Sequence, residues 1–304
     1  MRELFRTTRP DFLVLNHSLK YLPTLVQGRI LAPSRTAVAL WGHAVSYNSN
    51  HHAWVSYAKL KSARIASWYF SYTQAGASTM SASGFPAERI TVVNNTLDTD
   101  ALSRELAAVT PFKIDAFRSS QSLTEGHTAL FLGGVDDAKG FDFLIDVTRN
   151  AARIDPAFRM IIAGTGSRID KARELARQDF GLIVLGRVDG ASKAAALRSS
   201  EVLCIPSGIG LVAVDALFAG LGIVSRDDRT HGPEIDYLPK ISLTAMPPDV
   251  SAAEFSRRLV ARMLDGELAG EVAIASRAPA ANFTIEGMVE RFVEGVIAWG
   301  LSLQ

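Results

Sequence analysis

Short apolar runs alternate along most of this 304-residue chain with segments whose apolar residues recur every three or four positions. Runs of the first kind predict buried strands, and segments of the second kind predict amphipathic helices. In the first half, the expected strands are residues 11–15, 36–41, 67–71 and 89–93, and the expected helices are residues 19–31, 52–66 and 76–83. Strands that are regularly followed by helices favour a parallel sheet.

The alternation begins again after a polar, serine-containing stretch at residues 110–126, which we interpret as a linker. The expected strands beyond it are residues 129–132, 158–163, 182–185, 202–205 and 222–225. The expected helices are residues 141–153, a charged segment that ends near 178, 191–198 and 283–299. The sequence therefore predicts two α/β domains, at residues 1–118 and 119–281, and a last helical segment at residues 282–304.

Glycine-rich turns follow four strands of the second half, at residues 133–134, 164–166, 186 and 208–210. The carboxyl ends of parallel strands meet at one edge of a sheet, and ligands bind there in α/β folds. We therefore expect these turns to converge on a nucleotide pocket.

The most informative stretch is residues 206–220, with the sequence PSGIGLVAVDALFAG. A glycine loop before a helix makes an anion site, because free backbone N–H groups and the helix dipole point at the loop. Gly208 and Gly210 would let a phosphate approach the backbone closely. Asp215 interrupts the apolar helix, and it needs a partner because an unpaired buried carboxylate is costly. The hydroxyl groups of a bound sugar are one candidate partner for Asp215. The alternative is that the segment is an ordinary buried helix in which Asp215 has no role in binding.

Composition narrows the class of protein. The formal net charge is +1, which argues against a nucleic-acid partner. Cys204 is the one cysteine, so no disulfide forms within the chain, and a reducing compartment fits. No apolar run reaches the length of a membrane span, and the first residues lack an apolar signal core. We expect a cytoplasmic protein, with peripheral attachment to the inner face of the cell membrane still allowed.

Several further segments form a set of motifs with the stretch at 206–220. They are GGVDDAKGFDFLI (133–145), IIAGTG (161–166), VLGRV (184–188), THGPEIDYL (230–238), FTIEGMVERF (283–292), LWGH (40–43) and NNTLDTDAL (94–102). In combination, this set resembles the retaining glycosyltransferases of family 4, also called glycosyl transferases group 1.

The resemblance implies a GT-B fold, in which two Rossmann-like domains face a cleft and the last helix returns to the first domain. It implies an enzyme, a retaining hexosyltransferase that moves a sugar from a nucleotide-diphosphate sugar to a saccharide or lipid-linked acceptor. In this family such transfer serves cell-surface polysaccharide synthesis, and it needs no metal and no other cofactor. Front-face transfer is expected from the same resemblance.

The resemblance also assigns residues to the diphosphate of the donor. Lys139 matches a lysine that binds the diphosphate, and Gly134 stands where the family usually has an arginine, so Lys139 carries more of the neutralisation. The backbone N–H groups of Ile209, Gly210 and Leu211 would complete the site. The other glycines of the expected donor site are Gly133, Gly164 and Gly208.

Other positions are assigned to the nucleoside and the sugar. Asp215 stands where a family glutamate contacts the ribose hydroxyls, and Ser207 stands where another glutamate contacts the donor sugar. Glu234 matches an acid near the sugar. Gly186 and Arg187 would lie near the base, although Arg187 could equally be an ordinary surface arginine.

His43 matches a family histidine at a strand end of the first domain that faces the donor sugar. The expected catalytic residues are therefore His43, Lys139 and Ser207. A structural role for His43 stays open, because a lone histidine is more often structural.

Aromatic and basic residues recur at near-helical spacing in one stretch of the first half: Trp54, Tyr57, Lys61, Arg64 and Trp68. Such a face suits an anionic membrane surface. The alternative is a solvated helix whose aromatic rings pack into the core.

Compared with the family, the first domain starts late, because residues 11–15 resemble a middle strand of the usual domain. We expect an incomplete first domain, with an apolar edge and face left uncovered. Such a chain would turn over poorly unless a partner supplied the missing edge.

Two other functions stay open. One is a related GT-B enzyme of another class, such as a nucleotide-sugar epimerase. The other is a catalytically weak, nucleotide-sugar-binding subunit, because Gly134 and Ser207 stand at positions that are usually charged.

Overall fold

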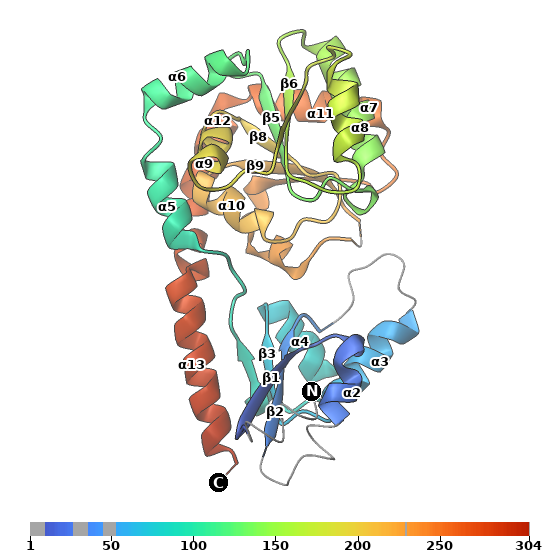
Figure 1. The fold of residues 1–304 in the computed structure, drawn as a ribbon, viewed down its shortest axis with the longest axis vertical. Helices are drawn as coiled ribbons and strands as arrows, with labels where there is room; N and C mark the ends of the chain where they lie inside the picture. The colour runs from blue at the N-terminus through green and yellow to red at the C-terminus, as the bar shows by residue number, and fades with distance from the viewer. Residues whose placement is uncertain (1–9, 27–35, 45–52, 229, 304) are drawn as a thin grey trace. The chain divides into compact units, whose positions relative to one another are not determined.

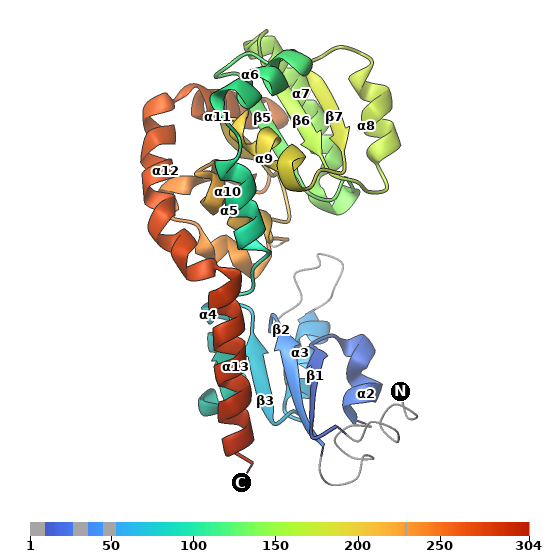
Figure 2. The ribbon, with the colours of Figure 1, turned by 60° about the vertical axis from the view of Figure 1, so that its left-hand side comes forward.

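The computed structural model describes residues 10–26, 36–44, 53–228 and 230–303, and the chain divides into two compact units. The first unit comprises Met1–Thr96 and Ile285–Gln304, and the second comprises Leu97–Thr284 (Figures 1 and 2). Each unit contains its own parallel sheet. The predicted class, two Rossmann-like α/β units, is therefore confirmed.

Four parallel strands form the first sheet, in the order β1 (Phe12–Asn16), β2 (Ala37–Gly42), β3 (Trp68–Ser71) and β4 (Ile90–Val92). Parallel neighbours joined in sequence by right-handed crossovers place their connecting helices on one face. That face packs against α2 (Leu22–Val26), α3 (Ala53–Ala63) and α4 (Gln74–Ala82). Short 3₁₀ turns, η1 (Leu19–Tyr21) and η3 (Ala87–Arg89), complete the described connections.

The opposite face of the first sheet packs against α13 (Ile285–Leu301) (Figure 2). Trp299 on this helix is fully buried against Trp68 and Phe70, and its Nε1 donates to Ser67 Oγ at 2.9 Å. The expectation of an uncovered face was therefore wrong for this side of the sheet. The reason is topological, since a helix from the far end of the chain supplies the cover that the crossovers cannot.

Six parallel strands form the second sheet, in the order β10-β9-β8-β5-β6-β7. In chain order they are β5 (Thr128–Leu132), β6 (Arg159–Ala163), β7 (Leu182–Gly186), β8 (Val202–Cys204), β9 (Gly222–Arg226) and β10 (Leu243–Met246). The order reverses between β5 and β8, which makes this a switch point of the doubly wound kind. The central strands are buried on both faces, which explains why they are continuous apolar runs.

Helices cover both faces of the second sheet (Figures 1 and 2). On one face α7 (Phe141–Ile154) packs against α11 (Ala252–Leu264), and α8 (Ile169–Ala176) packs against β7. On the other, α5 (Thr99–Ala107) packs against α9 (Gly190–Arg198) and α10 (Val212–Ala219). The remaining elements are α6 (Pro111–Ser120), α12 (Gly266–Ala280), η4 (Asp137–Lys139), η5 (Pro233–Tyr237), η6 (Lys240–Ser242) and η7 (Ala281–Phe283).

The division between the units differs from the boundary predicted at residues 118 and 119. Residues 97–118 belong to the second unit, because Leu102 and Leu106 of α5 are buried in its core. The expected linker at 110–126 contains α6, which Thr110 caps by accepting the N–H of Lys113 at 3.4 Å. Threonine at the N-cap followed by proline is a signal for the start of a helix. The polar composition of this stretch pointed to a linker instead.

The aromatic and basic spacing in the first half does not continue to Trp68. Trp68 lies in β3, is buried, and donates its Nε1 to Thr91 Oγ1 at 2.9 Å. Tyr57 on α3 is 62% exposed, with the ammonium of Lys61 5.2 Å from the ring centre. The side chain of Trp54 lies outside the described residues. No helix in the described part of the chain has the length and apolar character of a membrane span.

Candidate functional site

A cavity of about 460 Å³ opens at the carboxyl ends of β5, β6 and β7, beside α10. Five residues singled out from the sequence line it: Gly133, Gly134, Gly164, Arg187 and Asp215. Gly186 ends β7 and directly precedes Arg187, whose side chain is 82% exposed at the rim. The structure therefore brings three of the four glycine-rich strand ends together beside the switch point, while the turn at residues 208–210 does not line this cavity.

Main chain, rather than side chains, forms the wall of this cavity between β5 and β6. Gly164 has a φ of +156°, and a Cβ there would lie 1.8 Å from the carbonyl oxygen of Gly133. Only glycine permits this contact between the two loops. A wall of this kind lets a ligand approach the backbone closely.

Lys139 lies against the loop that precedes α10. Its ammonium donates a hydrogen bond to the carbonyl oxygen of Gly208. Gly208 has a φ of +70°, and a Cβ there would lie 2.8 Å from the lysine Nζ, so this arrangement needs glycine. Burial lowers the pKa of Lys139, while the carboxylates of Asp136 and Glu234 oppose that change. Asp136 also fixes the turn by accepting the N–H of Lys139 at 3.1 Å.

The backbone of this loop is partly engaged within the protein. The N–H of Ile209 donates to Nδ1 of His231 at 3.1 Å, and Nε2 of His231 lies 2.6 Å from the carbonyl oxygen of Arg226. This pattern fits an imidazole that carries its proton on Nε2. The N–H groups of Gly210 and Leu211 have no acceptor among the described residues. Of the three N–H groups expected to meet the diphosphate, two are thus open and one is used by His231.

Asp215 lies on α10 and forms an ion pair with Lys193 of α9, with 2.7 Å between Nζ and Oδ1. The carboxyl side chain is 9% exposed and the lysine side chain 22%. Burial raises the pKa of Asp215, and the ammonium of Lys193 opposes that rise. Sequence reasoning predicted that Asp215 needs a partner but missed Lys193, because no local pattern links residues on two different helices.

Ser207 is buried and its hydroxyl is held on two sides. It donates to Asp228 Oδ2 at 2.7 Å and accepts from Arg226 Nη2 at 2.5 Å. Glu234, in η5, is also buried, and its charge acts on Lys139. Sequence reasoning named Ser207 and Glu234, but not Arg226, the last residue of β9, or Asp228, which follows that strand.

His43 follows β2 in the first unit, where its ring lies 5.5 Å from that of Tyr72. Lys59 Nζ donates to the carbonyl oxygen of His43 at 2.7 Å. Burial, followed by the charge of Lys59, lowers the pKa of His43 to about 4. The imidazole is therefore neutral near pH 7.

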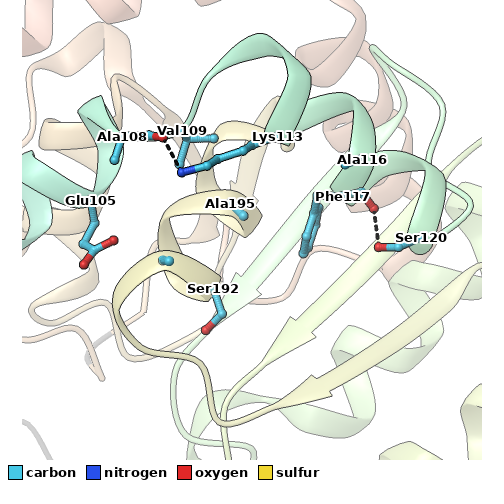
Figure 3. Close-up of a pocket in the computed structure, with 10 residues that line it drawn as sticks. Glu105, Ala108, Val109, Lys113, Ala116, Phe117, Ser120, Ser192 and Ala195 are labelled. Atoms are coloured by element: carbon cyan, nitrogen blue, oxygen red, sulfur yellow. Dashed lines mark hydrogen bonds between the residues drawn. The ribbon is translucent and has the colours of Figure 1, made fainter.

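A second hollow, of about 440 Å³, lies between α5, α6 and α9 (Figure 3). Phe117 and alanines form much of its lining, and the ammonium of Lys113 is bound to the carbonyl oxygen of Ala108 at 2.9 Å. It has no glycine-rich strand end, so we place the candidate site at the switch point instead. Among the described residues, no three His, Cys, Asp or Glu side chains are grouped as metal ligands would be.

Residues 126–259 match the family model described as Glycosyl transferases group 1. These residues contain β5 to β10 and the whole cavity. The second unit therefore contains a region that is similar to the glycosyl transferases group 1. The family resemblance drawn from the motifs is thereby confirmed.

Curated relatives of the group 1 domain include phosphatidyl-myo-inositol mannosyltransferases. The protein of that name from Mycobacterium tuberculosis strain H37Rv is 28% identical over 208 residues, which are 63% of this chain and 54% of the relative. The one from Mycolicibacterium smegmatis is 38% identical over 109 residues, 34% of this chain and 28% of the relative. The match thus spans about half the length of the mycobacterial protein.

Solved structures share the fold over nearly the whole chain. The structure of Anabaena Alr3699/HepE in complex with UDP and glucose has a TM-score of 0.74 and 18% identity, and covers 97% of this chain and 80% of its own. A glycosyltransferase from Rickettsia africae has a TM-score of 0.67 and 14% identity, with 96% and 77% covered. At such identities the likeness shows a common GT-B-type fold.

Proposed function

We propose that this protein is a glycosyltransferase that moves a hexosyl group from a nucleotide-diphosphate sugar to a saccharide or lipid-linked acceptor in cell-surface glycan synthesis. The observation that carries the proposal is the cavity at the switch point of a group 1 domain, lined by Gly134, Gly164 and Asp215. The UDP and glucose bound by the Anabaena protein, and the mannosyltransferase names of the relatives, support this donor class.

The residues of the site match the charge that develops during transfer. The departing diphosphate needs electrostatic stabilisation, which the ammonium of Lys139, the open N–H groups of Gly210 and Leu211 and the start of α10 provide. Asp215 would share its carboxylate between Lys193 and the ribose hydroxyls. Because the cation comes from the chain itself, we propose that transfer needs no metal. We propose retention of the anomeric configuration on the family resemblance alone.

Peripheral attachment to an anionic membrane also stays a proposal. The exposed ring of Tyr57 and the ammonium of Lys61 support it, on the outer side of α3. Trp68 does not take part, since it is buried in β3.

A panel of UDP- and GDP-sugars tests the proposed function. Turnover is followed by the release of nucleoside diphosphate, and the anomeric configuration of the product by proton NMR. We expect one donor to be turned over with retention, in the presence of EDTA, and Lys139→Met to lower turnover by about 100-fold or more, as for other lost transition-state donors. Methionine is a suitable replacement because it removes the charge of Lys139 and approximately preserves the length of the side chain.

Each contrary result identifies a different alternative. Interconversion of the free nucleotide sugar without transfer would make the protein an epimerase. Binding of nucleoside diphosphate without turnover of any donor would favour a binding subunit. An inverted product would refute retention alone, and a loss of turnover on removing metal would refute metal independence.

A further inference from the structure

Three polar side chains at the carboxyl ends of β8 and β9 form a connected group, which we call the Ser207–Asp228 cluster: Ser207, Arg226 and Asp228. The hydroxyl of Ser207 stands between the other two, 2.7 Å from Asp228 Oδ2 and 2.5 Å from Arg226 Nη2. Arg226 Nε also donates to the carbonyl oxygen of Pro206 at 3.2 Å, and its guanidinium lies 4.5 Å from the ring centre of Phe143. The cluster is therefore anchored at several points.

The cluster adjoins the diphosphate part of the proposed site. Ser207 directly precedes Gly208, whose carbonyl accepts from Lys139. A Cβ on Gly140, the residue after Lys139, would lie 3.3 Å from Arg226 Nη2 and 3.5 Å from Ser207 Oγ. Asp215, assigned to the ribose, lines the cavity, whereas no residue of the cluster lines it; the cluster lies instead beside the segment of Lys139 and Gly140. In a donor, the diphosphate separates the ribose from the sugar, so with the ribose at Asp215 and the diphosphate at Lys139 we place the sugar at the cluster.

Asp228 has the charge needed to accept hydroxyl protons. Burial by itself raises the pKa of its carboxyl, but hydrogen bonds from Thr230 and Ser207 outweigh burial and hold that pKa below its usual range. Oδ1 accepts from the N–H and hydroxyl of Thr230, and Oδ2 accepts from Ser207. A carboxylate has about four acceptor positions, so one is left for a ligand.

Arg226 adds donors beside that acceptor. Two of the five N–H groups of its guanidinium are used by acceptors in the described part of the chain, and Nη2 also lies 3.8 Å from Asp228 Oδ2. An ionised acceptor next to free donors is a pattern that suits neighbouring sugar hydroxyls, which both donate and accept.

We propose that Asp228, oriented by Ser207 and Arg226, is the carboxylate that binds the hydroxyl groups of the donor's sugar. The inference rests on the proposed function and adds a residue that determines donor specificity. It explains how a chain with serine at the position of a family glutamate still presents an acid there: the acid comes from the segment after β9 and is bound to that serine.

Asp228→Asn tests the proposal, because asparagine keeps an acceptor oxygen for Thr230 and nearly the same volume. With the donor that the wild-type protein turns over, we expect kcat/KM to fall by about 10- to 150-fold, the range for a lost charged hydrogen bond. The Kd of the nucleoside diphosphate, measured by calorimetry, should change less than twofold. The double variant Asp228→Asn with Ser207→Glu places a carboxylate at position 207 instead of position 228. Its kcat/KM should be at least tenfold higher than that of Asp228→Asn alone.

Three outcomes overturn the proposal. They are unchanged kcat/KM in Asp228→Asn, a parallel loss of nucleoside diphosphate binding, and a selective loss that Ser207→Glu does not recover. The last two would mean that the cluster only shapes the loop. Failure of the proposed function is distinguishable, since it appears in the wild-type protein as an absence of donor turnover.

Discussion

Asp215 and Lys193 form an ion pair in which each charge compensates the other's burial. The carboxyl side chain is 9% exposed, and its ammonium partner on the neighbouring helix lies 2.7 Å away. Removing one member of a buried pair leaves an uncompensated charge, which costs more than the pair itself contributes. The pair also joins α9 to α10 beside the cavity.

Lys193→Met should lower the free energy of unfolding by about 2 to 3 kcal/mol. This is less than the loss of about 3 to 5 kcal/mol for a fully buried pair, because the lysine is 22% exposed. Urea denaturation measures the change. Lys171→Met is the matched control: its partner Glu174 lies at 3.0 Å on the surface, and the expected change is within about 0.5 kcal/mol.

The combination Lys193→Met with Asp215→Asn should recover part of the lost stability, because no buried charge remains unpaired. Equal effects of Lys193→Met and Lys171→Met would show that the Asp215 pair is not energetically special.

At the scale of elements, α13 illustrates how packing departs from what sequence order suggests. The strands of the first sheet follow one another in order, so their crossover helices share one face. The amphipathic spacing of residues 283–299 predicted this helix correctly, with Met288, Phe292 and Val296 on its apolar side. Its return to the first domain was expected from the family resemblance, whereas its place on the opposite face of the sheet followed from no local pattern.

Gly295 sets how closely α13 approaches the sheet. A Cβ there would lie 2.6 Å from Phe70 Cε1 and 2.6 Å from Thr91 Oγ1. Gly295→Ala should destabilise the protein by about 1 to 3 kcal/mol through overpacking, although alanine is the better helix former by about 1 kcal/mol. Urea denaturation followed by tryptophan fluorescence measures the effect.

Gly300→Ala, on the same helix, is the control. The nearest atom that its Cβ would meet is Phe12 Cζ at 3.5 Å, an ordinary contact. We expect no loss of stability, or a gain of up to about 1 kcal/mol. A loss at Gly300 as large as that at Gly295 would contradict the packing argument.

Other elements show which local signals carry information. The central strands β5 and β6 were predictable because burial on both faces leaves an apolar run. The edge strand β10 was missed, since only Met246 of its four residues is buried and no such run results. Helix α11 was also missed, although Phe255, Leu259 and Met263 recur at helical spacing and would have predicted it.

At the scale of the whole molecule, alternation of strands and helices was enough to predict two parallel sheets, but not where one unit ends. Nothing in α5 itself indicates which sheet it joins; burial of Leu102 and Leu106 decides that. The glycine positions of the candidate site were predictable because each follows a strand. Lys193, Arg226 and Asp228 were not, because their roles depend on contacts between separate elements.

The central claim is that the cavity at the switch point binds the nucleotide part of a sugar donor. Hydrogen–deuterium exchange, with and without UDP or GDP, tests it most directly because bound ligand slows local opening. We predict protection in peptides that contain the cavity-lining residues 132–134, 163–165, 187–188, 212 and 215, and in residues 207–211, the loop that directly precedes α10. Protection confined to residues 105–120 or 191–195, around the hollow between α5, α6 and α9, or no protection at saturating nucleotide, would contradict the claim.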